Sequence, residues 1–564
     1  AAMIRGNRAT NVRQTDRGAV LHYTIGGVGH IALAPAPNWL PALAVLLCRK
    51  PQLRARLVIV PLNAMASAAS GDCVAVVTGR IEPLHTVPPL EVADRVVSGW
   101  QSVSLAAGLL GLVAVGLAAP LVTFAVTAVC VTIILIAYAA SRGCALMQSD
   151  MQPLPRRTLR TADLPVYTVL IPLYREKHGV GELVRAMRRF DYPRDKLDIQ
   201  FLVEENDHET RAAVLAATGE LSCRVCVVPD GLPRTKPRAL NVGLRQARGA
   251  LVTIFDAEDR PDPAQLRIAA ETFAAAPATV AALQARLSID HVRDTWMTKM
   301  FAIEYACQFD RILPMIAGRG RVFLLGGTSN HFRTESLLDV GGWDPFNVTE
   351  DADLAIRLRR RGYTLSVIDT ETFEEAPLTP GVWLKQRSRW FKGYMQTWLV
   401  HNRRPIAFIR DVGWVDAALT HLFIIGAITA ALAHNAMVVY VALALFGVVP
   451  LFGGQAGWLI GLQVVAALLS YGVNFALGAL AIRARGGRAL HPCEVLWFPV
   501  YWVLMGCAAA LAVYDLIRRP HHWRKTTHGV AQRPARRTRG TTAERLTPTE
   551  ADVRRPAVRA ALRR

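Results

Sequence analysis

Two blocks of almost uninterrupted apolar residues constrain this chain more than any other feature. The first runs from Trp100 to Met147 and is broken only near Ala119 and Pro120. Because a helix needs about 20 residues to cross a bilayer, residues 100–147 predict two transmembrane helices. The second block runs from about Ala417 to Leu516, with polar or turn-forming interruptions at Ala433–Ala436, Phe452–Ala456 and Ile482–Pro492. Residues 414–517 therefore predict about four more crossings, and we expect a multi-pass protein of the lipid bilayer.

The net charge of +21 is concentrated beside these blocks and at the end of the chain. Basic residues follow the second predicted helix, precede the third and follow the last, so the positive-inside rule places these flanks in the cytoplasm. The loop with Arg483, Arg485 and Arg488 disobeys this rule, because an all-crossing arrangement puts it outside. Anionic lipid headgroups account for the charge, and we expect no nucleic acid as partner. Residues 1–98 show no secretory signal and predict a small cytoplasmic α+β domain.

Residues 160–410 alternate between strand-like and helix-like segments. Short runs of β-forming residues lie at Tyr167–Tyr174, Asp198–Glu205, Arg224–Asp230 and Ala250–Asp259. Helically spaced segments separate them, which predicts βαβ units and a mostly parallel sheet. Such sheets bind ligands beyond the carboxyl ends of their strands. Glu204, Glu205, Asp256 and Glu258 are at these predicted ends.

Acidic residues in two segments of this domain are candidates for chemistry. Asp256, Glu258 and Asp259 offer oxygen ligands suited to Mg²⁺ or Mn²⁺, although a solvated acidic turn explains them equally well. Glu350 and Asp351 begin a predicted helix, where a carboxylate acts as a general base or simply complements the helix dipole. Taken singly, each segment leaves both interpretations open.

A third segment, Lys385–Arg404, combines aromatic and basic residues. By composition it is typical of a helix that lies on a membrane surface. Gln386, Arg389 and Trp390 have i, i+3 and i+4 spacing and therefore share one helical face. An arginine can pair with phosphate and a tryptophan can stack on a sugar, so this face predicts a site that holds both.

These three motifs together resemble a known family. Asp256-Ala257-Glu258, Thr349-Glu350-Asp351 and Gln386-x-x-Arg389-Trp390 are similar, in order and spacing, to the DxD, TED and QxxRW motifs of processive family 2 glycosyltransferases, the cellulose-synthase-like group. The resemblance covers residues 160–410. It implies an α/β, GT-A-like glycosyltransferase domain inserted between transmembrane α-helices, with its catalytic side in the cytoplasm at the bacterial inner (plasma) membrane. Glutamate stands at positions 204, 205 and 258 where the family often has aspartate, which leaves donor and metal preference open.

The resemblance also implies a role for each matching residue. The residues that would bind a UDP-sugar donor are Glu204, Glu205, Lys236, Asp256, Gln386 and Arg389, with Asp256 and Glu258 holding Mg²⁺ or Mn²⁺. Asp351 would be the catalytic base, and Trp390 and Glu350 would contact the acceptor. Asn330 and His331 are further acceptor-side candidates, with a glycine-rich structural turn as the alternative. Trp523, Thr526 and His528 resemble a gating loop in residues 518–564, which otherwise form a basic, disordered tail.

The function implied is inverting, processive transfer of a hexose from a UDP-sugar to a growing β-linked polysaccharide. The product would leave through the enzyme's own transmembrane helices, with room for accessory export subunits as partners. Two alternatives stay open: a non-processive membrane glycosyltransferase acting on a lipid-linked or short glycan acceptor, and an inactive transport or scaffold subunit. Glucose is the first expectation for the sugar and N-acetylglucosamine the second.

Overall fold

A computed structural model describes most of the chain from residue 91 to residue 520. The described ranges are 91–147, 154–219, 221–449, 457–485 and 490–520, together with five strands and residues 87 and 88 before them. The predicted gating segment with Trp523, Thr526 and His528, and the tail that follows it, lie outside the described residues.

A nine-stranded sheet forms the centre of the segment between the apolar blocks. Its order is β10-β13-β11-β12-β9-β6-β7-β8-β5. The strands are β5 (Val74–Val77), β6 (Tyr167–Leu173), β7 (Leu197–Glu204), β8 (Cys223–Val228), β9 (Leu251–Ile254), β10 (Arg260–Pro261), β11 (Val280–Ile289), β12 (Asn330–Arg333) and β13 (Thr364–Glu374). Strands β5 to β9 pair in parallel, as do β11 and β13, whereas β12 runs antiparallel to both of its neighbours. The predicted mostly parallel sheet is therefore present.

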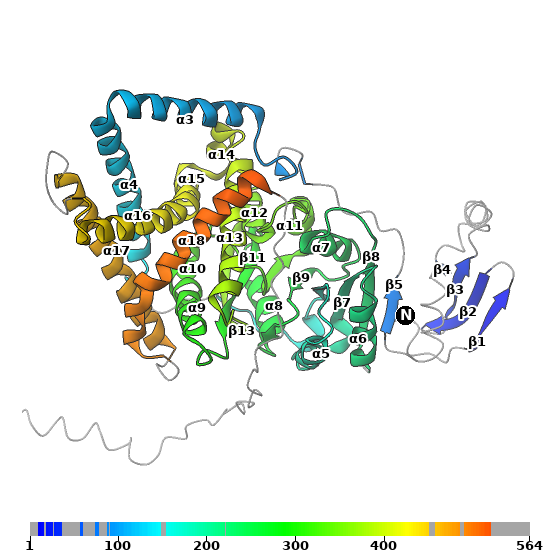
Figure 1. The fold of residues 1–564 in the computed structure, drawn as a ribbon. Coiled ribbons are helices and arrows are strands. Elements are labelled where there is room, and N and C mark those ends of the chain that lie inside the picture. Colours follow the sequence, from blue (N-terminus) through cyan, green and yellow to red (C-terminus); the bar gives the residue numbers. More distant parts are fainter. Residues whose placement is uncertain are drawn as a thin grey trace, which may run out of the picture. The chain divides into compact units, whose positions relative to one another are not determined.

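Helices cover both faces of this sheet (Figure 1). They are α5 (Val180–Arg188), α6 (His208–Thr218), α7 (Lys236–Arg245), α8 (Gln265–Ala275), α9 (Trp296–Cys307), α10 (Leu313–Ala317), α11 (Thr334–Asp339) and α12 (Glu350–Arg360). Side chains of a strand alternate between the two faces, so β6 contributes Val169 and Ile171 to the core beneath α5, α6 and α8. Leu170 between them belongs to the opposite core, with Leu240 of α7. This continuous burial explains why the strands are apolar throughout.

Five helical segments are long and apolar enough to span a membrane among the described residues. The first two are α3 (Gly99–Ala118) and α4 (Pro120–Gly143), where two were predicted. The other three are Trp414–Leu445, which contains α15 (Trp414–His421), the π-helical turn η8 (Leu422–Gly426) and α16 (Ala427–Leu445); α17 (Gly457–Ala484); and Pro492–Arg518, which contains the 3₁₀ turn η9 (Pro492–Trp497) and α18 (Phe498–Arg518).

The second apolar block thus contains three candidate spans in its described part, where about four were expected. The stretch Ala433–Ala436 is the reason, because it was counted as an interruption and lies inside α16. His434 accounts for its polarity: one ring nitrogen bonds the Tyr471 hydroxyl at 2.9 Å and the other faces the Pro499 carbonyl oxygen at 3.0 Å. A polar side chain with partners on neighbouring helices does not end an apolar helix.

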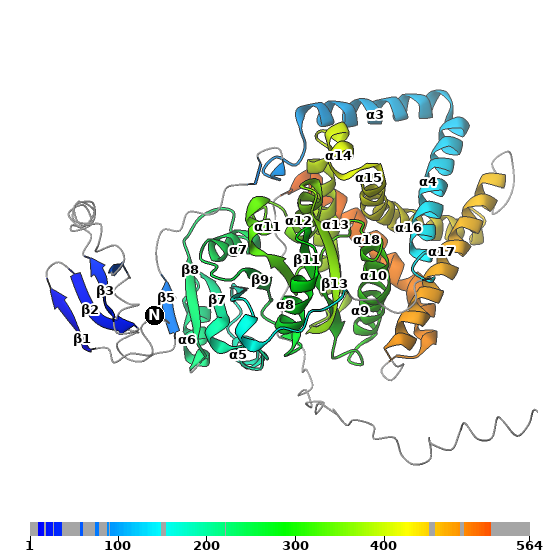
Figure 2. The ribbon, with the colours of Figure 1, turned by 180° about the vertical axis from the view of Figure 1, so that it is seen from behind.

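Helix α13 (Pro380–His401) joins the sheet domain to the second apolar block, and α14 (Pro405–Val412) follows it. It begins after the N-cap Thr379, with Pro380 at its first position, as helix starts favour. Figure 2 shows α18 beside α13, and bonds join them at both ends. Near their starts the Trp383 indole N–H donates to the Tyr501 hydroxyl at 2.9 Å, and near their ends the Gln396 amide donates to the Pro520 carbonyl at 2.8 Å.

The first hundred residues contain strands in two sheets. Strands β1 (Thr10–Thr15), β2 (Gly18–Ile25), β3 (Val28–Pro35) and β4 (Leu57–Ile59) form a four-stranded sheet of their own. Strand β5 instead pairs with β8 of the central sheet. Most other residues of the predicted α+β domain lie outside the described residues, so its boundaries at 1–98 stay a prediction.

Candidate functional site

A cavity of about 850 Å³ runs from the carboxyl ends of the central strands to the apolar helices. Most of the predicted site residues line it: Glu204, Lys236, Asp256, Glu258, Glu350, Asp351, Gln386, Arg389 and Trp390. Its other end is lined by residues of the candidate membrane spans, among them Tyr138, His434 and Tyr471. One continuous space therefore connects the motif residues of the sheet domain with the membrane helices.

Lys236 and Asp256 form an ion pair in this cavity. The Lys236 ammonium lies 2.5 Å from Asp256 Oδ1 and donates a hydrogen bond to the Gly327 carbonyl at 2.7 Å. Burial alone would lower the pKa of Lys236, but Asp256 and Glu350 raise it above its ordinary value. The lysine is therefore a fixed positive charge at the strand end where the sequence predicted the diphosphate of the donor.

Four carboxyl groups lie close to one another and to this lysine: those of Asp256, Glu258, Asp259 and Glu374. Asp259 accepts a hydrogen bond from the Asp256 backbone N–H at 2.6 Å, which holds the turn after β9. Burial and then repulsion from Glu258 and Asp256 raise the pKa of Glu374 to about 8. Burial and then Asp256 likewise raise the pKa of Asp259 well above its ordinary value. A bound cation would offset this repulsion and favour the ionised form of these carboxyl groups.

These residues suit a divalent cation that the donor helps to hold. Among the described residues, no three acidic, histidine or cysteine side chains are arranged to hold a metal ion by themselves. Mg²⁺ needs only one or two protein carboxylates when substrate phosphates and water complete its octahedral shell. Asp256 and Glu258 both line the cavity and supply such oxygen ligands. The donor set fits the predicted Mg²⁺ or Mn²⁺.

Glu350 and Asp351 are at the first two positions of α12, inside the cavity. Burial, together with repulsion from Asp351, raises the pKa of Glu350 to about 7. Burial also raises the pKa of Asp351, while its own backbone contacts and Lys236 oppose the shift. A buried carboxylate with a raised pKa at the floor of a cavity has the properties of a general base.

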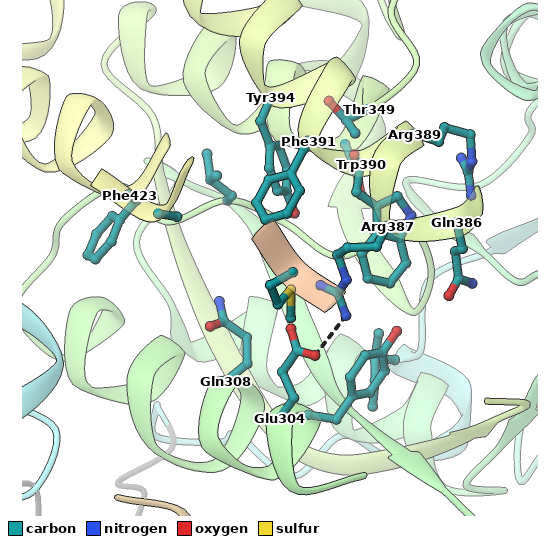
Figure 3. A pocket seen from close by; sticks show the side chains of 18 of the residues that line it. Glu304, Gln308, Thr349, Gln386, Arg387, Arg389, Trp390, Phe391, Tyr394 and Phe423 are labelled. Carbon is teal, nitrogen blue, oxygen red and sulfur yellow. Dashed lines mark hydrogen bonds and ion pairs between the residues drawn. The ribbon is translucent and has the colours of Figure 1, made fainter. Parts of the chain in front are cut away.

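Helix α13 places its motif on the wall of the cavity. Gln386, Arg389 and Trp390 all line it, as their helical spacing predicted (Figure 3). Burial lowers the pKa of Arg389, and Glu350, Asp351 and Asp256 oppose this shift. The arginine remains a cation at neutral pH because its pKa lies far above 7. The guanidinium is thus a buried positive charge near three carboxylates of the cavity.

Glu204 and Glu205, which are adjacent in sequence, have different surroundings. Glu204 ends β7, is buried, lies 3.5 Å from Arg238 and lines the cavity. Burial raises the pKa of Glu204 to about 7, and Arg238 opposes this. Glu205 is exposed and accepts a hydrogen bond from the Asp230 backbone N–H at 3.0 Å. The structure brings the first to the cavity and leaves the second outside its lining.

Asn330 and His331, the further acceptor-side candidates, lie within the sheet rather than along the cavity. They begin β12, which is inserted between β9 and β11, and both are almost fully buried. His331 Nδ1 lies 2.6 Å from the Tyr167 hydroxyl, and burial lowers the pKa of this histidine to about 3. The preceding Gly326 and Gly327 line the cavity in their place. The glycine-rich structural turn, kept as the alternative, describes this segment.

Several residues of the cavity belong to none of the sequence motifs. Glu374 ends β13 and accepts a hydrogen bond from the Tyr305 hydroxyl at 3.0 Å. Glu304 of α9 and Arg387 of α13 form an ion pair at 2.7 Å. Glu374 could have been predicted, because it is an acidic residue at a strand end, as Asp256 is. The ion pair of Glu304 and Arg387 could not, because it joins residues 83 positions apart and no local sequence pattern indicates it.

A comparison with protein families fits this geometry. Residues 165–393 match the family described as glycosyltransferase like family 2. This segment is similar to the glycosyltransferases of that family. It contains the strand-end carboxylates, the start of α12 and the motif of α13. The predicted α/β glycosyltransferase domain flanked by apolar helices is thereby confirmed.

Individual relatives of the glycosyltransferase domain share low identity with it. The chain is 26% identical over 252 residues to a probable glycosyltransferase, YdaM, of Bacillus subtilis, covering 43% of this chain and 58% of that protein. It is 28% identical over 259 residues to a β-monoglucosyldiacylglycerol synthase of Synechocystis, covering 45% and 53%. It is 26% identical over 255 residues to a probable glucomannan 4-β-mannosyltransferase of Arabidopsis thaliana, covering 44% and 56%. The chain thus spans little more than half the length of these relatives.

Solved structures are similar at a still lower level. A mannosyltransferase of Pyrobaculum calidifontis in complex with GDP-Man and Mn²⁺ aligns at 19% identity and a TM-score of 0.38, covering 69% of this chain and 99% of that one. A glucosyl-3-phosphoglycerate synthase of Mycobacterium tuberculosis with Mn²⁺ and UDP aligns at 14% identity and a TM-score of 0.29, covering 46% and 88%.

Proposed function

We propose that the chain transfers a hexose from a UDP-sugar to a growing β-linked polysaccharide, with inversion and processively, and exports the product through its membrane helices. One observation carries the proposal: a single cavity contains Asp256, Asp351 and Arg389 at one end and membrane-helix residues at the other. A glycosyltransferase that released its product into water would have no use for the second end.

The reaction step follows from the side chains of the cavity. The Asp351 carboxylate accepts the proton of an acceptor hydroxyl, and the oxygen of that hydroxyl bonds to the anomeric carbon of the donor sugar. The bond from that carbon to the diphosphate breaks, and UDP leaves with the bonding electrons. Burial raises the pKa of Asp351, which brings its basicity closer to that needed at neutral pH.

Positive charge around the leaving group stabilises this step. Lys236 and Arg389 line the cavity near Asp256 and provide cations for the developing charge on UDP. A divalent cation, when bound, neutralises the diphosphate and eases its departure, and Asp256 and Glu258 would hold it. Gln386 adds an amide to the same wall, and Trp390 offers a flat aromatic surface for the acceptor sugar.

The acceptor is the open part of the proposal. The diacylglycerol named for the Synechocystis relative suggests single transfer to a lipid, whereas the glucomannan named for the Arabidopsis relative suggests a polymer. The membrane end of the cavity combines aromatic rings with polar groups, as Tyr471, Trp502 and Asn474 illustrate. Such a mixed lining suits a sugar chain, with apolar ring faces and polar edges, better than an acyl chain.

Product analysis with the purified, detergent-solubilised chain tests the proposal. UDP-glucose, UDP-N-acetylglucosamine and GDP-mannose are each offered with Mg²⁺ or Mn²⁺, beside the Asp351→Asn variant. A high-molecular-weight polymer from a UDP-sugar, absent in the variant, is expected. If only single sugars are added to a lipid or short glycan, processive synthesis is refuted and the non-processive alternative holds. If neither UDP nor GDP is released under any condition, the alternative of an inactive transport or scaffold subunit is favoured.

A further inference from the structure

A polar cluster lines the cavity between the motif residues and the membrane helices. Its members are Glu304 near the end of α9, Gln308 directly after that helix, and Arg387 of α13. Figure 3 shows Glu304 and Gln308 on one side of Trp390, and Gln386 and Arg389 on the other. The cluster therefore lies on the acceptor side of Trp390, away from the groups assigned to the donor.

Glu304 is fixed in place by two hydrogen bonds to the same carboxylate oxygen. Arg387 Nη2 donates to it at 2.7 Å, and the Tyr501 hydroxyl of α18 donates to it at 2.6 Å. The Glu304 side chain nevertheless keeps 28% of its surface exposed, and it lines the cavity. A carboxylate that is held rigidly and still open to a cavity is preorganised to accept hydrogen bonds from a ligand.

Arg387 is held between aromatic rings. Its guanidinium carbon lies 4.5 Å from the centroid of the Trp390 ring and 5.3 Å from that of Trp383. The side chain is 9% exposed, and its buried Nε has no hydrogen-bond partner within the described part of the chain. Arg387 is thereby held rigidly beside Glu304, with the Trp390 ring against its guanidinium.

Gln308 begins a π-helical turn, η7 (Gln308–Ile312), at the end of α9. Such turns insert an extra residue into a helix and recur at functional sites, because they redirect the side chains that follow. Here the residues of the turn that line the cavity are Gln308, Phe309 and Ile312. The turn thus presents an amide beside the Glu304 carboxylate.

We propose that Glu304, Gln308 and Arg387 form a subsite for a neutral sugar residue of the acceptor, next to the one that stacks on Trp390. The carboxylate and amide bind sugar hydroxyls, and the aromatic rings cover apolar ring faces. Since Arg387 is already paired with Glu304, the subsite has no surplus charge for a phosphate or a uronic acid. An acyl chain would desolvate this ion pair without replacing its hydrogen bonds. The assignment of Trp390 to the acceptor rests on the proposed function.

Equilibrium dialysis of cellotetraose and mannotetraose against the full chain, saturated with UDP and Mg²⁺, tests the subsite directly. Glu304→Gln and Gln308→Leu are each expected to weaken binding of one of these sugars about tenfold, the effect of losing roughly one hydrogen bond to a charged or amide group. Affinity for UDP-glucose should stay unchanged in both variants. Gln308→Leu is informative even if Glu304→Gln misfolds, because Glu304 accepts bonds from Arg387 and Tyr501 whereas the Gln308 side chain makes no such bond within the described residues.

Glu494→Gln is the matched control. Glu494 forms an ion pair with Lys299 at 2.8 Å. This pair joins the segment that contains Tyr501 to α9, the helix of Glu304, but neither residue lines the cavity. It should bind both sugars as the wild type does. Wild-type affinity in the two subsite variants, an equal loss of UDP-glucose binding, or absence of tetrasaccharide binding by the wild type would each overturn the subsite. If the wild type binds a tetrasaccharide, the variants lose this binding and the protein makes no product, the subsite stands and the proposed function is refuted instead.

Discussion

Replacing Gly393 by alanine should damage catalysis more than its small size suggests. Gly393 lies in α13, three residues after Trp390, and packs against Thr349, the N-cap of α12. A Cβ at this position would lie 2.5 Å from Thr349 Cγ2, 2.6 Å from Oγ1 and 2.9 Å from Cβ. Ordinary contact distances begin near 3.5 Å, so the two helices must separate by roughly 1 Å.

The expected changes in stability and kcat of Gly393→Ala follow from two opposing effects on stability and one on the position of the catalytic groups. Overpacking costs about 1–3 kcal/mol, while alanine in place of glycine in a helix interior returns up to about 1 kcal/mol. We therefore expect a net loss of stability of about 0–2 kcal/mol, which leaves the protein folded. Thr349 directly precedes Glu350 and Asp351, however, and a shift of about 1 Å in a catalytic group lowers kcat on the order of 10²-fold.

The assay is UDP release under saturating donor, beside a thermal unfolding curve. Gly381→Ala is the matched control, because it lies in the first turn of the same helix with nothing within 4 Å of its Cβ. That variant should retain full activity. Partial rescue is expected when Thr349→Gly is added to Gly393→Ala, since this removes the clashing side chain. Wild-type kcat in Gly393→Ala would refute the idea that this contact sets the position of Asp351.

Further predictions concern the base, the buried acids, the sheet histidine and the metal. Asp351→Asn should lower kcat on the order of 10² to 10⁴-fold with unchanged donor affinity, measured by initial rates and donor titration. The folded pKa of Glu374 is raised to about 8, so between its ordinary pKa of 4.5 and pH 8 the unfolded chain ionises first and stability falls as pH rises. In Glu374→Gln the unfolding midpoint should therefore decline less across this range, and an equal decline would contradict the shift. His331→Ala should lower the free energy of unfolding by about 1–3 kcal/mol through loss of the Tyr167 bond, with an unchanged acceptor KM. EDTA should abolish transfer and Mg²⁺ or Mn²⁺ should restore it, whereas activity that survives chelation would argue against a cation at Asp256.

The strands and the motif helix were predictable because their patterns are local. Apolar β-forming runs located β6 and β7 within one residue at their starts, and the acidic residues after the strands marked the cavity. The i, i+3, i+4 spacing also placed Gln386, Arg389 and Trp390 on one wall. Each of these inferences depends on residues that are close in sequence.

Contacts made by distant segments were beyond the reach of such patterns. Glu304 meets Arg387 and Tyr501 only because α9, α13 and α18 pack together. Asn330 and His331 follow a glycine pair that looks like a ligand loop, but β12 enters the sheet antiparallel between β9 and β11 and so buries both. Strand pairing between residues 46 to 82 positions apart is set by the whole core and leaves no local signature.

Helix α18 lies along α13 and is bonded to it at both ends, through Tyr501 and through the Pro520 carbonyl. The chain leading into α18 is also attached to the sheet domain, because Arg485, at the end of the preceding helix α17, bonds Asp310 at 2.9 Å. The basic loop that broke the positive-inside rule in an all-crossing arrangement therefore begins at a residue bonded to the domain that contains Asp351.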